Sequence, residues 1–514
     1  MTKALLVNPP YLDSFWSFKP ICRNLGAKAM APPLGLLTVA ALLPREWQFR
    51  LVDMNAHPLT ESDWQWGDLV LFTGMLAQKE GLLALIREAK ARGKTVVAGG
   101  PYASSVPEGV LAAGADFLVR GEAENLEDEL LAALREGKPQ KVLEHPNKPE
   151  MTRSPIPRFD LIHPPDYISM CIQTSRGCPF DCEFCDVVSL YGRKPRYKDP
   201  DQVLAELECL YDLGWRREVF IADDNFIGDK KHARAILEKL IPWMKSRGEP
   251  FGFWTQASIN LGQDPGLVDL LTAANFNYVI VGVETPDPKL LAATRKKQNI
   301  QNPLDQSVTN IMNNGLGVMA SFIIGLDGEE KGAVDRICDF VERNHIPIVT
   351  LNTLQVFPNT ALWQRLQQEG RLLEEMTTGD MEGGRLNYLP TRPEAEILEE
   401  YARGIKYLCE PSIFLDRAYR HILAMRPTRR ALGLEKEEDH RQEGKNDLPG
   451  KKFELWQLTS TLQFFWRQGV RADTRGQFWR QLLEVYRRNP SRLRKYLLLC
   501  VVGENMFARR AKLA

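Results

Sequence analysis

The chain has 514 residues, of which 44% are hydrophobic and 26% charged, a composition typical of folded globular proteins and not of disordered or fibrous ones. Lys and Arg (66) balance Asp and Glu (66), so no overall charge favours nucleic acid as a partner. No apolar run approaches the ~20 residues that cross a bilayer, and the apolar run at the N-terminus is too short for a signal peptide. Nine cysteines in so long a chain do not suggest a secreted disulfide framework. We expect a cytoplasmic protein of roughly two to four domains.

Five short apolar segments predict strands within residues 1–140. They are residues 4–8, 49–53, 68–72, 94–98 and 116–119, and segments with helical periodicity separate them. This alternation predicts an α/β domain with a doubly wound, parallel, five-stranded sheet of flavodoxin-like type. Such sheets bind ligands beyond the carboxyl ends of their strands. The residues at those ends are Asn8, Asp53, Asn55, Thr73, Gly74, Met75, Gly99, Gly100, Gly121 and Glu122.

The remaining chain divides into three further parts. Residues 141–166 are rich in proline and predict a linker. Six strand candidates then alternate with helical segments, at 168–174, 218–222, 251–256, 277–283, 317–324 and 348–356. They predict a (βα)6 partial TIM barrel over 167–385, with its active site at the carboxyl ends of the strands. Residues 386–514 predict a helical C-terminal domain, interrupted by a charged mobile loop at about 434–452.

The strongest motif is Cys178-x3-Cys182-x2-Cys185, which follows the first barrel strand and a glycine. Three thiolates at this spacing can bind three irons of one [4Fe–4S] cluster and leave the fourth iron open to another ligand. A structural zinc site or a four-cysteine cluster needs a fourth ligand, such as Cys171. Cys171 lies inside an apolar strand, where a buried free thiol is common, so we favour the open cluster.

With an aromatic residue, Phe184, before its last cysteine, this motif resembles that of the radical S-adenosylmethionine superfamily, and the resemblance extends over about 167–365. It implies a [4Fe–4S] cluster held by the three cysteines, which are the catalytic residues, and S-adenosylmethionine, from which a 5′-deoxyadenosyl radical is generated. By the same resemblance, Phe184 lies near the adenine and Glu284 meets the ribose. The segment that binds the methionine amine corresponds to Asp223, Asp224 and Asn225, and the segment that packs against adenine contains Ile324 and Gly325.

The N-terminal domain resembles the cobalamin-binding domain of class B radical methylases. Thr73-Gly74-Met75 and Gly99-Gly100 fit the Ser-x-Leu and Gly-Gly elements of cobalamin domains. Asn55 stands where the cobalt-ligating histidine of many such domains lies, and His57 is two positions out of place. We interpret His57 as a loop residue, and the resemblance implies cobalamin bound without that histidine.

Cobalamin beside a radical initiator implies methylation of an unactivated carbon. Residues 186–196, the Pro-Pro-x-Gly-Leu-Leu segment at 32–37 and the helical C-terminal domain narrow the resemblance to the subgroup of the hopanoid C-2 methylase. We therefore expect a lipid or isoprenoid-type small-molecule substrate, a hopanoid being one option, and an electron donor such as flavodoxin or ferredoxin. Arginines interleaved with aromatic residues in 463–495 predict peripheral contact with the inner membrane surface, although such helices commonly pack on their own protein.

Other reactions are compatible with the same motifs. Oxidative cyclisation or rearrangement would use the same cofactors, and a non-catalytic cobalamin or iron–sulfur sensor would bind them without turnover. A methylthiotransferase would need a second three-cysteine cluster in the N-terminal domain, which contains only Cys22.

Overall fold

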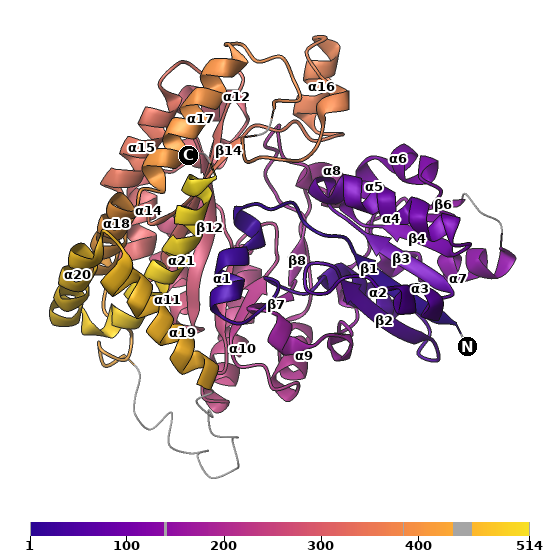
Figure 1. Cartoon of the computed structure of the whole chain (residues 1–514), viewed down its shortest axis with the longest axis horizontal. Helices are drawn as coiled ribbons and strands as arrows, with labels where there is room; N and C mark the ends of the chain where they lie inside the picture. Colours follow the sequence, from indigo (N-terminus) through magenta and orange to yellow (C-terminus); the bar gives the residue numbers. More distant parts are fainter. Residues whose placement is uncertain (1, 138–140, 384, 435–454, 513–514) are drawn as a thin grey trace.

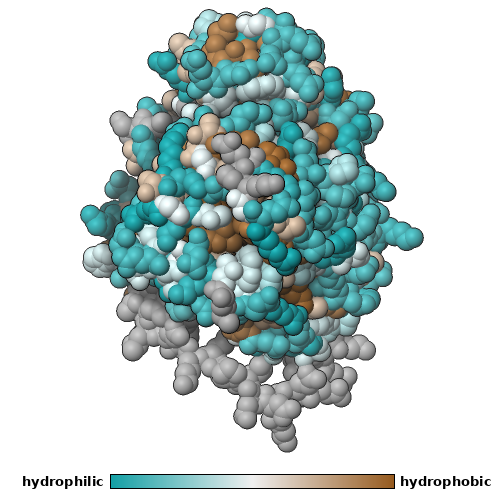
Figure 2. All heavy atoms as spheres, turned by 90° about the vertical axis from the view of Figure 1, so that its right-hand side faces the viewer, coloured by the Kyte–Doolittle hydropathy of each residue, from teal (hydrophilic) through white to brown (hydrophobic). Residues whose placement is uncertain are grey.

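The computed structural model describes residues 2–137, 141–383, 385–434 and 455–512. An N-terminal α/β domain, a barrel-like sheet and a set of C-terminal helices follow one another along the chain (Figure 1). The face on the side of the N-terminal domain is mainly hydrophilic, with small separate apolar areas (Figure 2). The predicted mobile loop at 434–452 lies, apart from residue 434, outside the described residues.

The N-terminal sheet is parallel and doubly wound, as predicted. In the described residues it has six strands in the order β2-β1-β3-β4-β5-β6: β1 (Lys3–Asn8), β2 (Gln48–Asp53), β3 (Leu69–Thr73), β4 (Thr95–Gly99), β5 (Phe117–Arg120) and β6 (Lys141–Glu144). Helices α2 (Leu34–Leu42) and α7 (Glu127–Glu136) pack on one face, and α3 (Glu61–Trp66), α4 (Lys79–Ala91), α5 (Pro101–Ser105) and α6 (Pro107–Ala112) on the other.

The prediction of five strands was therefore one strand short. Strand β6 lies within the segment that was predicted to be linker, and pairs with β5 at the edge of the sheet. Of its four residues only Leu143 is fully buried. A four-residue edge strand with one buried side chain has no apolar pattern from which to predict it.

The second sheet is the predicted partial barrel. Its strands are β7 (Ser169–Ile172), β10 (Glu218–Ile221), β11 (Gly252–Gln256), β12 (Phe276–Glu284), β13 (Gly317–Ile324) and β14 (Ile348–Thr353). All neighbours pair in parallel, and β7 and β14 form the two edges. Helices α9 (Pro200–Asp212), α10 (Lys230–Ser246), α11 (Pro265–Ala273), α14 (Leu304–Asn313) and α15 (Ala333–Arg343) connect the strands on the outside.

Burial alternates along the barrel strands in a way that separates their two faces. On β12, Val279, Val281 and Val283 are fully buried, whereas Ile280 and Gly282 between them are only partly buried. The valines lie on the face covered by helices. In a filled TIM barrel the inner side chains pack into a dense core, whereas here Ile280 and Gly282 on the inner face are not fully buried.

A segment of the N-terminal domain closes the open side of the barrel. Residues 29–30 run beside β7, where the Ser169 amide donates to the Met30 carbonyl at 2.9 Å. Helix α1 (Lys19–Asn24) then lies against α21 (Leu493–Ala511) (Figure 1). On the far edge, Arg509 of α21 donates to the Leu351 carbonyl of β14 at 2.7 Å. The interior is thus enclosed by parts of all three domains.

The C-terminal domain is helical, as predicted. It contains α17 (Glu394–Leu408), α18 (Pro411–Ala424), α19 (Leu455–Trp466), α20 (Arg475–Arg488) and α21. Among the described residues, no helix has the length and apolarity required to cross a membrane.

Candidate active site

The three cysteines lie on a loop that a short antiparallel ribbon closes. The ribbon is formed by β8 (Ser175–Arg176) and β9 (Arg196–Tyr197). The loop between these strands carries Cys178, Cys182, Cys185 and helix α8 (Val187–Tyr191). All three cysteines are partly buried and none is in a disulfide, so their thiols are available to a metal cluster.

Glycine is required immediately before the first cysteine. Gly177 has φ = 95°, and a Cβ atom there would lie 2.9 Å from the Gly192 carbonyl oxygen. The Cys178 amide donates to the same Gly192 oxygen at 3.3 Å. Because only glycine combines this φ with such a close backbone approach, Gly177 sets the path of the loop.

The chemistry of three cysteine thiols on one loop suits an iron–sulfur cluster. Among the described residues, no group of three or more His, Cys, Asp and Glu side chains could hold one metal ion. A zinc site gathers its ligands around one ion, whereas each cysteine of a [4Fe–4S] cluster binds a different iron. Cys171, the alternative fourth ligand, is buried within β7. Burial raises the pKa of the Cys178 and Cys185 thiols, so cluster binding must be coupled to release of protons.

The acidic segment after β10 supports the cysteine loop. Asp223 is fully buried and accepts hydrogen bonds from the backbone amides and hydroxyls of Thr174 and Ser175. Asp224 accepts from the Gly177 amide at 2.8 Å. Burial raises the pKa of Asp224 to about 7. Asn225 pairs with Ser258 at the end of the next strand. Among Asp223, Asp224 and Asn225, Asp224 accepts the fewest hydrogen bonds within the protein, and its carboxylate can therefore best accept one from a ligand amine.

Glu284 ends β12 in a strained conformation beside the cysteine loop. It has φ = 64°, and the pairing of β12 with β13 shifts register at this point. Its carboxylate forms a buried ion pair with Lys296, whose ammonium lies 5.8 Å from the centroid of the Phe184 ring. The predicted ribose and adenine residues, Glu284 and Phe184, are therefore brought together by Lys296, which the sequence analysis did not identify.

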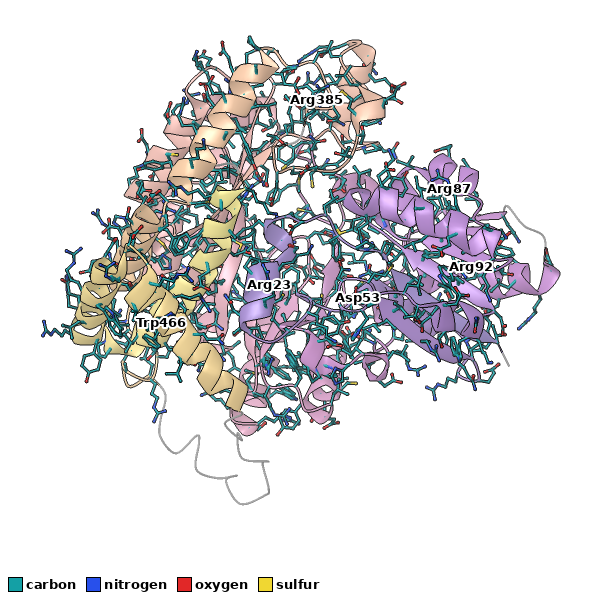
Figure 3. All side chains as sticks on the ribbon, viewed as in Figure 1. Arg23, Asp53, Arg87, Arg92, Arg385 and Trp466 are labelled. Carbon is teal, nitrogen blue, oxygen red and sulfur yellow. The ribbon has the colours of Figure 1, made fainter. Side chains whose placement is uncertain are left out.

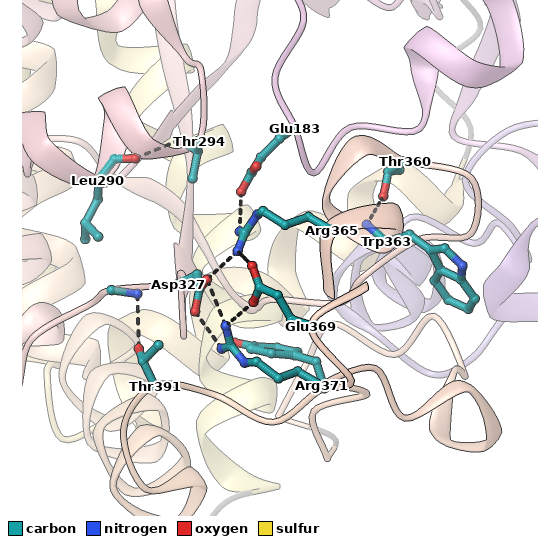
Figure 4. A network of polar contacts seen from close by, with 12 residues as sticks. Glu183, Leu290, Thr294, Asp327, Thr360, Trp363, Arg365, Glu369, Arg371 and Thr391 are labelled. Atoms are coloured by element: carbon teal, nitrogen blue, oxygen red, sulfur yellow. Dashed lines mark hydrogen bonds and ion pairs between the residues drawn. The ribbon is translucent and has the colours of Figure 1, made fainter. Parts of the chain in front are cut away.

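An ion-pair network anchors the same loop to the far side of the barrel (Figure 4). Arg365 of α16 (Ala361–Gln368) lies 2.9 Å from Glu183, between the second and third cysteines. Arg365 also lies 2.8 Å from Asp327, which Arg371 approaches at 2.7 Å. The Glu183 amide donates to the Thr294 carbonyl at 3.1 Å. The loop is thus held from several sides before any cluster binds.

The two residues of the predicted adenine segment, Ile324 and Gly325, lie in different surroundings. Ile324 is fully buried and shares the outer face of β13 with Phe322, which packs against Phe340 of α15. The inward-facing neighbour is Ile323, which is partly buried. Gly325 has φ = 89°, and its amide donates to Glu329 at 3.1 Å. At this position Ile323, and not the Ile324 side chain, faces the interior.

The interior of the barrel has an aromatic wall and a polar wall. Phe220 and Trp254 stack with their centroids 4.0 Å apart, and Trp254 is in register with Tyr278. On the opposite strands, Asn352 donates to Ser321 at 3.3 Å. Two further oxygens, Thr350 Oγ1 and Asn352 Oδ1, are buried and have no hydrogen-bond partner among the described residues. Unpaired buried polar atoms are rare in folded proteins and point to a missing partner.

At the N-terminal sheet, Asp53 organises the predicted cobalamin face. Its carboxylate accepts from the side-chain amides of Asn8 and Asn55, at 2.9 and 2.8 Å. Its other oxygen accepts from the Tyr167 hydroxyl at 3.2 Å, just before β7, and Asp53 lies on the side of the domain that faces the barrel (Figure 3). His57 lies 2.6 Å from Asp166, consistent with its interpretation as a loop residue.

The ends of β3 and β4 are built from small residues. Gly100 has φ = 89°, and a Cβ there would lie 2.3 Å from Thr73 Oγ1. Gly74 accepts from the Tyr102 amide at 2.9 Å, and the Met75 side chain is exposed. Together with Gly99, they leave a surface with little side-chain bulk at the strand ends, as a large planar ligand requires.

The last two predicted cobalamin residues contact the barrel loop. The Gly121 amide donates to Ser104 at 2.8 Å, while Glu122 is buried and forms ion pairs with Arg176 and Arg196. A cavity of about 140 Å³ lies between these parts of the chain. Its lining includes Ser104, Gly121, Glu122, Pro149, Leu190 and Asn359. Glu122 therefore joins the two sites instead of lying free to bind a ligand.

Comparison with known proteins agrees with this division of the chain. The B12 binding domain matches residues 24–131, the Radical SAM superfamily residues 172–341, and a domain of unknown function (DUF4070) residues 360–514. The chain is 43% identical over 508 residues to an uncharacterised methyltransferase of Synechocystis sp., covering 99% of this chain and 92% of that protein. It is 33% identical over 518 residues to the hopanoid C-2 methylase of Rhodopseudomonas palustris, covering 99% and 94%. The chain belongs to the cobalamin-binding radical S-adenosylmethionine family.

Solved structures show the same fold for this radical S-adenosylmethionine enzyme. The methyltransferase TsrM of Kitasatospora setae, with cobalamin and a [4Fe–4S] cluster, has a TM-score of 0.58 and 18% identity, covering 72% of this chain and 78% of TsrM. The cobalamin-dependent enzyme OxsB with aqua-cobalamin has a TM-score of 0.61 and 15% identity, covering 100% and 80%. The cofactors are a [4Fe–4S] cluster, S-adenosylmethionine and cobalamin.

The residues present fit these groups. The three cysteines would hold the cluster, and the glycine surface at Gly100 would admit cobalamin. Near Cys182, the buried oxygens Gln298 Oε1 and Asn299 Oδ1 have no partner in the described part of the chain, as expected where a polar ligand binds. When bound, the cofactors supply one-electron chemistry and carriage of a methyl group, for which no side chain suffices. Lys296 and Gln298 were missed because they lie in a charged, polar run typical of a surface.

Proposed function

We propose that this enzyme transfers a methyl group to an unactivated carbon of an isoprenoid-type lipid, with a hopanoid as the first substrate to test. The observation that carries the proposal is 33% identity to a hopanoid C-2 methylase over nearly the whole of both chains. The shared length includes the helical C-terminal domain, so the relation is not confined to the parts that bind cofactors.

The two walls of the barrel support a substrate of this kind. A polycyclic hydrocarbon skeleton would pack against Phe220 and Trp254, and burial of apolar surface contributes about 25 cal/mol per Å². The unpaired oxygens of Thr350 and Asn352 would accept hydrogen bonds from a substrate hydroxyl. A substrate with one polar group on a large apolar skeleton would match both walls.

The residues of this chain have distinct tasks in the proposed reaction. The cysteine loop, braced by Asp223 and Asp224, holds the cluster near the carboxyl ends of the barrel strands. The ion pairs of Glu122 with Arg176 and Arg196 keep the N-terminal domain against that loop. Residues 9–33 and α21 exclude water from the open side of the barrel, which protects a reactive intermediate from side reactions.

Label transfer tests the proposal. The protein, purified and reconstituted without oxygen, is incubated with methyl-labelled S-adenosylmethionine, reductant and a hopanoid, and lipids are analysed by mass spectrometry. We expect a labelled methyl group in the lipid and none with Cys182→Ala. Formation of 5′-deoxyadenosine with an unlabelled, dehydrogenated or rearranged product would favour a cyclase or rearrangement enzyme. Absence of 5′-deoxyadenosine in the loaded protein would favour a sensor.

We further propose that a small acidic electron donor, such as a flavodoxin or ferredoxin, docks beside the cysteine loop. Arg193 and Lys194, which follow α8, are exposed there. Their charge is complementary to an acidic partner, and opposite charges accelerate association. Charge reversal of both residues should slow cluster reduction by flavodoxin in stopped-flow experiments, while reduction by dithionite stays unchanged.

A membrane surface is the second proposed partner. The α19–α20 patch comprises Leu462, Trp466, Val470, Trp479, Leu483 and Tyr486, all exposed, with Trp466 at 61% (labelled in Figure 3). Trp479 stacks on Phe465 and donates to the Gly469 carbonyl at 2.8 Å, which joins the two helices. Exposed arginines flank the patch at 471, 475, 480, 487 and 488. Apolar rings surrounded by arginines match an anionic lipid surface.

Vesicle flotation tests this contact. We expect the protein to float with vesicles containing anionic lipid and much less with zwitterionic vesicles. The double variant Trp466→Ser, Tyr486→Ser should lose flotation, whereas Leu213→Ser, which removes an exposed apolar residue elsewhere, should not. Equal flotation of wild type and the double variant would contradict the proposal.

A further inference from the structure

Gln298 is directed at a cluster-binding cysteine. It lies on α13 (Lys297–Gln301) and is buried. Its side-chain amide Nε2 lies 3.6 Å from Cys182 Sγ, within hydrogen-bond range for sulfur. Gln298 is thus placed to donate an N–H···S hydrogen bond to a ligand of the cluster.

The position of Gln298 is firmly held. The neighbouring Asn299 side chain donates to the carbonyl oxygens of Gly282 and Val283, at 3.1 and 3.0 Å, which fastens α13 to the end of β12. Asn302 donates to the Gln298 carbonyl at 2.7 Å. The side chain therefore reaches Cys182 from an anchored backbone and not from a free loop.

A positive charge lies on the same side of the loop. The Lys296 ammonium is buried beside Phe184, which stands between Cys182 and Cys185. The partner of this ammonium is the buried Glu284 carboxylate, so the charge is balanced within the site. A hydrogen-bond donor at Cys182 and the Lys296–Glu284 ion pair beside Phe184 thus lie next to each other at the cysteine loop.

We propose that Gln298 raises the reduction potential of the [4Fe–4S] cluster by donating to Cys182. Reduction brings one electron from an external donor into the cluster and increases the negative charge on its sulfurs. Hydrogen bonds to the sulfurs and nearby charge are established determinants of cluster potential. The hydrogen bond from Gln298 stabilises the reduced state more than the oxidised one, which eases reduction by a weak physiological donor.

The test is a redox titration of the reconstituted enzyme, followed by electron paramagnetic resonance of the reduced cluster. Gln298→Glu keeps the shape of the side chain but replaces the donor by a carboxylate. We expect its midpoint potential to fall by at least 59 mV, equivalent to a tenfold change in the one-electron equilibrium. Gln298→Leu should shift it in the same direction by less. Gln301→Glu, exposed on the same short helix, is the matched control and should leave the potential unchanged.

The measurement needs no substrate, so it is independent of the proposed methyl transfer. Wild-type potential in Gln298→Glu or Gln298→Leu, with iron content retained, would overturn the proposal. Gln298→Asn, whose amide is one methylene further from Cys182, gives the same test with a smaller change and should also lower the potential. Loss of the cluster from all three variants would contradict the proposal too, because it assigns Gln298 an effect on potential and not on cluster retention.

Discussion

Arg176 Nη1 lies 2.8 Å from Glu122 Oε2, and both side chains are buried. Arg176 immediately precedes Gly177 and the cysteine loop, whereas Glu122 follows the last residues of β5 in the N-terminal domain. Arg196 on β9 approaches the same carboxylate at 2.7 Å. One carboxylate therefore ties both strands of the ribbon that closes the cysteine loop to the cobalamin-binding domain.

Replacing Glu122 by Gln should destabilise the protein and weaken cluster retention. The variant leaves Arg196 buried without its carboxylate and Arg176 with Glu124 alone, and breaking such a buried pair costs about 3–5 kcal/mol. Denaturant unfolding measures the loss, and iron content after desalting measures retention. Glu144→Gln removes a solvent-exposed pair with Arg120 and should cost less than about 1 kcal/mol. Equal effects of the two variants would show that Glu122 does not join the domains.

The sequence predicted those features of the site that are local in the chain. The cysteine spacing, the glycine before it and the six barrel strands all follow from short patterns. The hydrogen bonds of Asp223 could not be predicted from the sequence, because their donors, Thr174 and Ser175, lie 49 and 48 residues earlier. Such partners become neighbours only once β7 and β10 pair.

Glu284 could likewise be predicted from the sequence, whereas Lys296 could not. Glu284 was predicted from the family resemblance, which places a polar residue at the end of this strand, where ligand-binding residues collect. Lys296 follows twelve residues later in the run Arg295-Lys296-Lys297, whose composition is typical of a solvated surface. Only the short helices after β12 turn Lys296 inward to meet Glu284, and no pattern of charges in the sequence shows which of three cations is buried.

Gly177→Ala should disturb the cysteine loop more than the small change in size suggests. Alanine would need a φ of 95° and would bring its Cβ to 2.9 Å from the Gly192 carbonyl oxygen, strain of order 1–3 kcal/mol. We expect several-fold less iron per protein after reconstitution. Gly476→Ala, where nothing lies within 4 Å of the new Cβ, is the control. Normal iron content in Gly177→Ala would show that the loop can relax around the methyl group.

Asn352→Leu should uncouple S-adenosylmethionine cleavage from product formation. If Asn352 Oδ1 accepts a hydrogen bond from substrate, its loss should lower methylation by about 2- to 13-fold, since such a bond contributes about 0.5–1.5 kcal/mol. Formation of 5′-deoxyadenosine without substrate should stay within about twofold of wild type, because the side-chain amide of Asn352 donates to Ser321 and not to the cysteine loop. Gln65→Leu, exposed on α3, controls for the added leucine. Wild-type methylation by Asn352→Leu would remove the polar wall from substrate recognition.

Lys495 should make the stability of the protein depend on pH in alkaline solution. Its ammonium donates to the Asn277 carbonyl at 2.8 Å and lies 4.5 Å from the centroid of the Tyr278 ring, at the base of the barrel. Burial, helped by nearby Arg492, lowers the pKa of Lys495 to about 7. Between pH 7 and the ordinary lysine value of about 10.4, the unfolded chain therefore binds more protons than the folded one. Stability should rise with pH across this window, by at most about 1.4 kcal/mol per pH unit.

Lys495→Met removes the buried charge and tests this relationship directly. At pH 7 the variant should be more stable than wild type, because no ammonium has to be buried on folding. The advantage should disappear toward pH 10.5, where the wild-type lysine is neutral in the folded state and about half neutral in the unfolded state, and where methionine lacks the bond to Asn277. Urea unfolding at a series of pH values gives both curves. Lys239→Met, at an exposed pair with Asp201, should run parallel to wild type, and a parallel curve for Lys495→Met would mean that Lys495 keeps its proton when folded.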